Sequence, residues 1–395
     1  MSNPSTKQKV NVILLSIGHF FNDFYCNFLP VLLPIIMPRL DLSLTMSGLL
    51  VMVMSFTSNV LQPFFGYLMD KRNLSKLLLI AIPFGAFFIC MAGYVTTKIS
   101  LFIIIALSGL AVSSFHPLGS TLVSKVANHK NLGLALSQYV AGGNIGFAFA
   151  PLIIVYFTQS YDLKSLPILI IPGLLLSFAY YYTRLYRIST KQDNQKDADN
   201  EELNLRTLLC SSSVIKLNTA MALRAWTHVT MSTFLPLLLI NRGDTPTFAG
   251  GMLTIFLVGA AAGGLIGGYL GDRIGHKKII ILSLLVGVFP TYYFFTHAII
   301  DAFSLLALFL CGAGLQAPQP SSLIWAQRLL PNHAGIASGM MMGLSFGIGS
   351  IGTALTAALG DHIGLNNALT LTTLPIFFAA LVALWIPFPK ENNSV

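Results

Sequence analysis

The sequence predicts an all-α membrane protein in which twelve transmembrane helices form two six-helix halves. Apolar residues make up 54% of the 395-residue chain and charged residues only 9%, against roughly 25% charged residues in soluble domains. The apolar runs are close to the ~20 residues that a helix needs to cross a bilayer. The heptapeptide GYLMDKR at residues 66–72 returns as GYLGDRI at residues 268–274. A repeat at half the chain length indicates a duplicated bundle.

Six apolar runs fall in each half of the chain. In order, we expect the spans at about residues 10–37, 46–69, 77–97, 100–124, 133–158 and 165–186, then 214–240, 248–271, 279–298, 302–327, 334–359 and 365–387. Residues 1–186 would form the N-terminal half, residues 187–213 a polar cytoplasmic linker, and residues 214–395 the C-terminal half. The halves also share FLPVLL at 28–33 and FLPLLL at 234–239. This similarity predicts parallel repeats about an axis along the membrane normal.

The positions of the basic residues predict the orientation. Of the 23 lysines and arginines, 18 lie on the side of the N-terminus, the even-numbered loops and the C-terminus. Four lie on the other side, and Arg224 lies inside a span. Because cytoplasmic loops carry the excess of basic residues, both termini are expected in the cytoplasm. Confinement of the net charge of +9 to short loops argues against a nucleic-acid partner.

Asp23 is the only acidic residue deep in a predicted span. His19 precedes it by four residues and Asn22 lies three from His19, so the three share one side of a helix. His116 stands before Pro117 in the fourth span, and histidine titrates near neutral pH. Ionisable residues inside a membrane are costly and mark function, so we assign Asp23, His19 and His116 to proton coupling. The alternatives are a structural carboxylate neutralised by a cation and a packing histidine.

Arg224 is the only basic residue deep in a predicted span. Arginine stays protonated, so its side chain requires an anionic partner or an aqueous cavity. Three interpretations remain open: it binds an anionic group of a substrate, it pairs with Asp23, or it forms a static ion pair. His228 lies four residues further on the same helix, with Trp226 between them.

Other residues are assigned by type. Uncharged or aromatic polar residues are candidates for the wall of a substrate cavity, with interhelical hydrogen bonding as the alternative for the amides: Asn22, Trp226, His228, Gln138, Asn144, Gln316 and Gln319. Small residues and a proline suggest close helix packing: Gly142, Gly146, Pro151, Gly343 and Gly347. The four scattered cysteines suggest no metal site, and no Walker sequence supports nucleotide binding.

Several segments resemble a known family. The sequence GYLGDRIGHKK at residues 268–278 resembles the cytoplasmic loop signature of the major facilitator superfamily. GHFFND at 18–23, LQPFFGY at 61–67, SFHP at 114–117 and GGNIG at 142–146 resemble the fosmidomycin-resistance branch of bacterial proton-coupled drug exporters. The similarity covers nearly the whole chain. The first loop copy departs from the signature by Lys71 and by lacking the second glycine, and Ala150-Pro151 stands where antiporters carry glycine-proline.

The resemblance implies a major facilitator fold and proton-driven export of small, drug-like or amphipathic molecules, some of them anionic, by alternating access. In this family the loop motif closes a cytoplasmic gate, a role that would fall on Gly66, Asp70, Gly268, Asp272 and Arg273. A proton symporter that imports a small organic anion is the main alternative. A membrane sensor or scaffold is disfavoured, because the linker of about 27 residues leaves no room for an output domain.

We therefore expect a non-enzymatic transporter in the bacterial inner membrane, associated with efflux and antibiotic resistance. Its partners would be a small-molecule substrate and membrane lipid, with neither nucleic acid nor nucleotide. No cofactor is expected beyond protons as the coupling ion, and the chain is expected to be a monomer.

Overall fold

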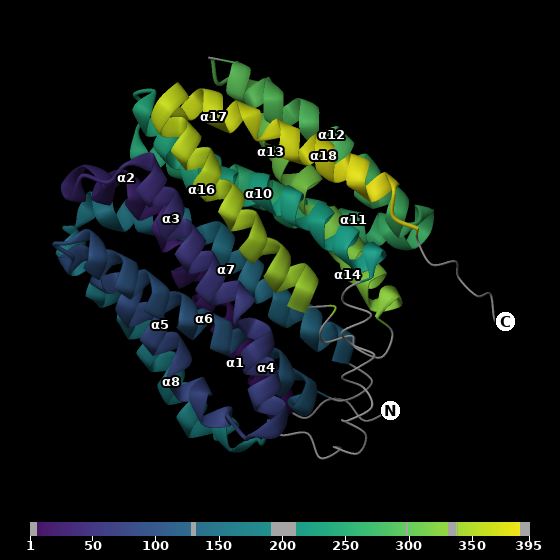
Figure 1. Cartoon of the computed structure of the whole chain (residues 1–395). Helices are drawn as coiled ribbons and strands as arrows, with labels where there is room; N and C mark the ends of the chain where they lie inside the picture. Colours follow the sequence, from purple (N-terminus) through teal and green to yellow (C-terminus); the bar gives the residue numbers. More distant parts are fainter. Residues whose placement is uncertain are drawn as a thin grey trace. The chain divides into compact units, whose positions relative to one another are not determined.

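The structure is a computed structural model that describes residues 6–127, 132–190, 211–297, 299–330, 337 and 339–387. Every element in these ranges is a helix, as the composition predicts (Figure 1). The chain divides into two compact units. Unit 1 comprises residues 1–42, 53–193 and 243–254, and unit 2 comprises residues 43–52, 194–242 and 255–395. The start of the second span therefore belongs to unit 2, and the start of the eighth belongs to unit 1.

Unit 1 contains the helices of the first six predicted spans. Its elements are α1 (Thr6–Cys26), α2 (Phe28–Leu40), the end of α3 (Leu44–Ser55), the π-helix η1 (Phe56–Val60), α4 (Gln62–Lys71), the 3₁₀ helix η2 (Ser75–Leu79), α5 (Ala81–Cys90), the 3₁₀ helix η3 (Met91–Tyr94), α6 (Lys98–Val126), α7 (Leu132–Ser160), the 3₁₀ helix η5 (Leu163–Ile170), α8 (Ile171–Thr183) and the 3₁₀ helix η6 (Leu185–Arg187).

Unit 2 contains the helices of the second set of spans. Its elements are α10 (Ser212–Asn241), most of α11 (Pro246–Ile274), α12 (His276–Thr296), α13 (Ala302–Gln316), α14 (Pro318–Leu329), the π-helix η7 (Met340–Leu344), α16 (Ser345–Ile363), α17 (Leu365–Leu371) and α18 (Thr373–Leu384).

Ten helical stretches in the described ranges are long and apolar enough to cross a membrane. Two of the twelve predicted spans are absent from this set. The span predicted at 77–97 corresponds to a shorter apolar stretch, Ala81–Tyr94. The span predicted at 214–240 corresponds to α10, a 30-residue helix whose buried face carries polar residues such as Asn218, Arg224 and His228. These buried polar groups lower the hydropathy of a helix that is otherwise of full length.

Helix α7 packs against α1 (Figure 1), and glycines of α7 make the contact. A Cβ atom added at Gly142 or Gly146 would come within 3.0 Å of a backbone carbonyl oxygen of α1, that of Ser16 or Phe20 respectively. Because glycine has no Cβ, the two backbones can approach closely enough to touch. Pro151 continues α7 beyond this contact as a buried residue inside the helix.

Helix α16 makes the corresponding contact with α10 in unit 2. A Cβ atom at Gly349 would lie 2.7 Å from the Ala225 Cβ, and one at Gly352 would overlap the indole of Trp226. Of the two glycines that we assigned to packing here, Gly347 is buried in α16 and Gly343 is buried in η7.

The two loop-motif glycines occupy equivalent positions in their units. A Cβ atom at Gly66 would lie 4.0 Å from the Pro117 Cβ in α6, and one at Gly268 would lie 3.5 Å from the Pro320 Cβ in α14. The prolines belong to the pairs His116-Pro117 and Gln319-Pro320, which the sequence places at similar positions in the two halves. The duplication thus extends from sequence to packing.

The close contact between α1 and α7, which we call the seam, predicts that one added methyl group lowers the stability of the protein. Gly146→Ala would force the α7 Cβ into the Phe20 carbonyl, so we expect it to lower the free energy of unfolding by about 1–3 kcal/mol, as overpacking does. Thermal unfolding of the purified protein in detergent measures this.

The matched control is Gly251→Ala in α11, where an added Cβ meets no atom within 4 Å. This variant should be unchanged, or more stable by up to about 1 kcal/mol, because alanine favours helix. Equal melting temperatures for the two variants would contradict the close approach.

Candidate functional site

The candidate site in unit 1 is built on one turn of α1. His19 and Asp23 lie four residues apart, and the His19 Nε2 is 3.3 Å from the Asp23 Oδ2. Asn22 donates a hydrogen bond from its Nδ2 to the Asp23 Oδ1 at 3.1 Å. Both His19 and Asn22 are buried. The four-residue spacing brings the imidazole to the carboxylate, and the amide of the adjacent Asn22 donates to the same carboxylate.

The backbone of α7 fixes the orientation of the His19 ring. Its Nδ1 lies 2.8 Å from the carbonyl oxygen of Tyr139, and the Tyr139 ring stacks on the imidazole with centroids 4.2 Å apart. A carbonyl oxygen only accepts, so the His19 Nδ1 carries the proton in this contact. The His19 Nε2 is buried and has no hydrogen-bond partner of good geometry. This nitrogen is therefore directed at the carboxylate.

His116 reaches the same carboxylate from α6. Its Nε2 is 3.4 Å from the Asp23 Oδ1 and 3.3 Å from the Asn22 Nδ2. The two imidazole rings meet edge to face, with centroids 5.0 Å apart. Asp23 thus lies between two histidines that come from different helices. All three residues that we assigned to proton coupling meet at one point, and Asn22, which we assigned to substrate, joins them.

Gly143 of α7 lies directly against this group. A Cβ atom there would lie 2.5 Å from the Asp23 Oδ2 and 2.6 Å from the His19 Nε2. The absence of a side chain at this position leaves room for the carboxylate and the imidazole. The glycine sequence of α7 therefore serves the polar cluster as well as the packing of α1.

Arg224 is the centre of a second polar site, in unit 2. It is completely buried in α10 and donates from its Nη1 to the Leu315 carbonyl and to the Gln316 Oε1, both at 2.8 Å. The Phe346 ring lies 4.8 Å from its guanidinium carbon. Its Nε and Nη2 are buried and have no hydrogen-bond partner. Among the described residues of unit 2, no carboxylate neutralises this guanidinium. Its pairing with Asp23 stays a prediction.

The break between α13 and α14 supplies one of these acceptors. Leu315 lies in the last turn of α13, where carbonyl groups lack intrahelical donors. The helix stops at Ala317, and Pro318 and Pro320 follow in α14 without N–H groups to continue the ladder. These prolines remove the N–H groups that would bond the Gly314 and Gln316 carbonyls, and at the break between the two helices the Leu315 carbonyl accepts from Arg224.

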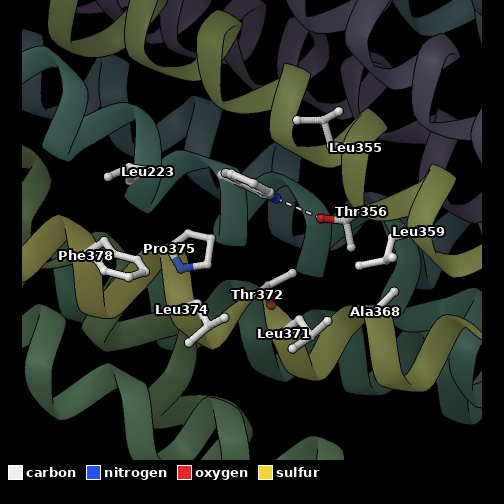
Figure 2. A pocket seen from close by; sticks show the side chains of 11 residues that line it. Leu223, Leu355, Thr356, Leu359, Ala368, Leu371, Thr372, Leu374, Pro375 and Phe378 are labelled. Atoms are coloured by element: carbon white, nitrogen blue, oxygen red, sulfur yellow. Dashed lines mark hydrogen bonds between the residues drawn. The ribbon is translucent and has the colours of Figure 1, made fainter. Parts of the chain in front are cut away.

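Helix α10 separates the residues that we grouped with Arg224. His228 is buried on the same side, between the rings of Phe256 and Phe346, at centroid distances of 5.4 and 5.8 Å. Trp226 is two residues from Arg224, or about 200° around the helix. Its indole N–H donates to the Thr356 hydroxyl at 2.8 Å. The Trp226 side chain lines an apolar pocket of about 360 Å³ (Figure 2).

That pocket is unlike a site for a charged group. Figure 2 shows Leu223, Leu355, Leu359, Leu371 and Phe378 lining it, together with other labelled residues of α16, α17 and α18. Its polar groups in the view are the hydrogen bond that ends on Thr356 and the hydroxyl of Thr372, and none of the residues that line it is charged. The structure therefore does not bring Trp226 together with Arg224.

The other four amide candidates fall at different places. Gln316 holds Arg224, and Gln319 donates from its Nε2 to the Met341 carbonyl in η7 at 2.9 Å, while its Oε1 is buried without a partner. Gln138 and Asn144 are exposed on α7. Gln138 lines a second apolar pocket with Phe20 and Phe21 of α1.

The gate candidates differ in how much of them the structure describes. The side chain of Asp70 lies outside the described residues. The Asp272 side chain is 72% exposed, and its Oδ1 is 3.7 Å from the Nε2 of buried His276, whose Nδ1 contacts the Ser321 hydroxyl in α14. The Arg273 guanidinium lies over the Tyr269 ring at 4.2 Å. Their role in a gate stays a prediction.

Sequence reasoning missed the partners that fix the two charged sites. The carbonyls of Tyr139 and Leu315 belong to no motif, because a backbone acceptor has no residue signature. Phe346 could not be singled out as a partner of Arg224, because the sequence contains 28 phenylalanines. Pro318 was the single available signal, since a proline interrupts the hydrogen-bond ladder of a helix and marks the break near Leu315.

Comparison with known sequences identifies the family. The family model for the Major Facilitator Superfamily matches residues 15–341 and residues 225–395. The Fosmidomycin resistance protein of Escherichia coli K12 is 27% identical over 361 residues, which cover 89% of this chain and 86% of that protein. YfnC of Bacillus subtilis 168, an uncharacterised transporter of the superfamily type, is 27% identical over 99% of this chain and 96% of its own length. The Multidrug resistance protein MdtG of Enterobacter lignolyticus is 26% identical over 61% of this chain and 58% of its own length.

Solved structures share the fold. A mutant form of the nucleoside transporter NupG superposes with a TM-score of 0.81 at 16% identity, over 96% of this chain and 99% of that one. A bacterial homologue of the human lysosomal transporter Spinster gives 0.78 at 12% identity, over 96% and 97%. At these identities the similarity concerns the fold alone.

Proposed function

The chain belongs to the Major Facilitator Superfamily and is a multi-pass membrane transporter, and from this we propose that it is a proton-coupled antiporter that exports small molecules. Its relatives carry the names Fosmidomycin resistance protein and Multidrug resistance protein, which supports efflux. We place it in the bacterial inner membrane with both termini in the cytoplasm, as the distribution of basic residues favours.

The observation that carries proton coupling is the contact of one carboxylate with two histidines. Asp23 has a His19 nitrogen 3.3 Å from one oxygen and a His116 nitrogen 3.4 Å from the other. Histidine changes charge near neutral pH, so this group can gain and lose protons in the range of a cellular gradient. In the proposed cycle a proton from outside enters this cluster and substrate leaves outward. Release of the proton to the cytoplasm resets the transporter.

The proposed substrate side of the cycle involves Arg224. A buried guanidinium with two unpartnered nitrogens has unused capacity to donate to an anion. Leaving buried donors unpaired costs about 1–3 kcal/mol each, a cost that an anionic substrate group would relieve. We therefore expect substrates with a carboxylate, phosphonate or similar group to bind here, and fosmidomycin is the first compound to test.

Asp23→Asn should abolish energy coupling. In everted vesicles with a lumen one pH unit more acidic than the medium, exchange of one proton per substrate supports up to about tenfold accumulation, because tenfold corresponds to ~1.4 kcal/mol. Asparagine keeps the shape of the side chain and cannot carry the proton, so accumulation should fall to about onefold. Uptake of labelled substrate with and without the gradient measures this.

The matched control is Asp301→Asn, which changes an acid that caps α13 through Ser304. Asparagine is also a good N-cap, so full accumulation is expected. Retention of gradient-driven accumulation by Asp23→Asn would exclude Asp23 as the coupling site. The same vesicles test the symporter alternative: acidification of the lumen should draw substrate into the lumen for an antiporter and out of it for a symporter that imports.

Arg224→Gln should weaken the binding of an anionic substrate more than the binding of a neutral one. Hydrogen bonds to charged groups contribute about 1.5–3 kcal/mol, so the affinity for an anionic substrate should fall about 10- to 150-fold. The affinity for its neutral ester should change little. Arg224→Lys should recover part of the loss because it keeps the positive charge. Binding measurements on the purified unmodified protein and on both variants test this.

Arg242→Gln is the control, at the C-cap of the same helix. Arg242 follows α10 and donates to the Asn366 Oδ1 at 2.5 Å. It should leave the ratio of anion to ester affinity unchanged. Equal loss for the anion and the ester in Arg224→Gln would show that Arg224 supports the fold rather than binding an anion.

A further inference from the structure

We propose that His19, Asp23 and His116 form a binding site for a divalent transition-metal ion, with Zn²⁺ as the best match. One ligand atom from each residue lies within 4.8 Å of the others. Two imidazole nitrogens and one carboxylate are a common set of protein ligands for Zn²⁺ in sites that keep a fourth position open. The three residues come from α1 and α6 of the same unit.

The hydrogen bonds around the histidines leave acceptors pointing at one another. The His19 Nδ1 donates to the Tyr139 carbonyl, so a neutral His19 presents the lone pair of Nε2 to the Asp23 Oδ2. The His116 Nε2 lies 3.3 Å from the Asn22 Nδ2 and 3.4 Å from the Asp23 Oδ1, and in the tautomer that carries its proton on Nδ1 it is a further acceptor beside the carboxylate. Acceptors that converge in a buried space repel unless a cation lies among them.

The distances suit Zn²⁺. Tetrahedral bonds of ~2.0–2.1 Å place neighbouring ligand atoms about 3.3–3.4 Å apart. The two nitrogen–oxygen distances in the cluster are 3.3 and 3.4 Å. They involve the two different oxygens of Asp23, so the carboxylate would bind through both or turn slightly toward one. All the ligand atoms lie within 4.8 Å of one another, so the two nitrogens would approach by at most about 1.4 Å to bind the same ion.

The surroundings supply the second shell that metal sites require. A metal-bound histidine usually donates its other nitrogen to a carbonyl or carboxylate, as His19 does to Tyr139. Asn22 already holds the Asp23 Oδ1, and its contact with the His116 Nε2 would give way to the ion. Gly143 leaves the space beside the carboxylate free of a side chain. The site needs no residue beyond those already in place.

Metal binding at this cluster does not depend on the direction of transport or on proton coupling. Where the proposed coupling role of Asp23 also holds, a bound ion would take the position of the proton and stop the cycle. Binding is therefore tested without transport, so that failure of either proposal can be recognised by itself.

The experiment uses the full-length protein in detergent, freed of metal with a chelator. Co²⁺ is titrated at pH 7.5 and followed by its visible absorption, which becomes intense when the ion leaves octahedral water for a four- or five-coordinate site. We expect one equivalent to bind and to be displaced by Zn²⁺. Zn²⁺ should also raise the melting temperature, because it binds the folded state.

Two variants and one control identify the ligands. His19→Asn keeps a donor for the Tyr139 carbonyl and loses Nε2, whereas His116→Gln keeps an acceptor for Asn22 and loses the imidazole. Each should weaken binding more than roughly 100-fold, beyond the 10- to 100-fold typical of second-shell changes. His297→Gln, at a residue stacked on Tyr293 at the end of α12, should bind like the unmodified protein.

Asp23→Asn provides a third variant if one of the histidine variants fails to fold, as its melting curve without metal would reveal. Absence of a stoichiometric site in the unmodified protein would overturn the proposal. A site that survives in His19→Asn, His116→Gln or Asp23→Asn with unchanged affinity would also overturn it.

Discussion

The close approach of the α1 and α7 backbones is the constraint on which the unit 1 site depends. Gly142 and Gly146 allow α7 to touch the carbonyl groups of α1. At that separation the Tyr139 carbonyl reaches the His19 ring, and Gly143 leaves space for Asp23. A methyl group on this face would therefore disturb both the packing and the polar cluster. Stability and chemistry rest here on the same small residues.

Unit 2 has the same kind of glycine contact between helices as unit 1, but different ionisable residues lie beside it. Gly349 and Gly352 of α16 lie against α10 as the α7 glycines lie against α1, and each half places ionisable residues four apart on its first helix. In unit 1 the pair is His19 and Asp23, with a second histidine as partner. In unit 2 it is Arg224 and His228, with a carbonyl and an amide as partners. Duplication preserved the seam that small residues make, while the charged positions diverged.

The sequence predicted what depends on spacing along one helix. The contact of His19 with Asp23 follows from a separation of four residues, and the glycine pattern of α7 indicated the seam. The approach of His116 could not be derived, because it depends on how α6 packs against α1. Helical geometry also separates Trp226 from Arg224, at about 200°, whereas their closeness in the sequence had grouped them. The shorter stretch Ala81–Tyr94 differs from its predicted span because the 3₁₀ helix Ser75–Leu79 is separated from it by a turn at Ile80.

The hydrogen bond between His19 and Tyr139 limits how the cluster of His19, Asp23 and His116 can lose a bound proton or metal ion. With the Nδ1 proton committed to the carbonyl, the His19 Nε2 can face the Asp23 carboxylate at 3.3 Å only while a proton or a metal ion neutralises the pair. Loss of that cation leaves two acceptors in contact inside a buried space. The repulsion is relieved only if the His19 ring releases the Tyr139 carbonyl or Asp23 moves away from Gly143. Either change alters the fit of α1 against α7, so the charge state of the cluster is tied to the geometry of the seam that holds it.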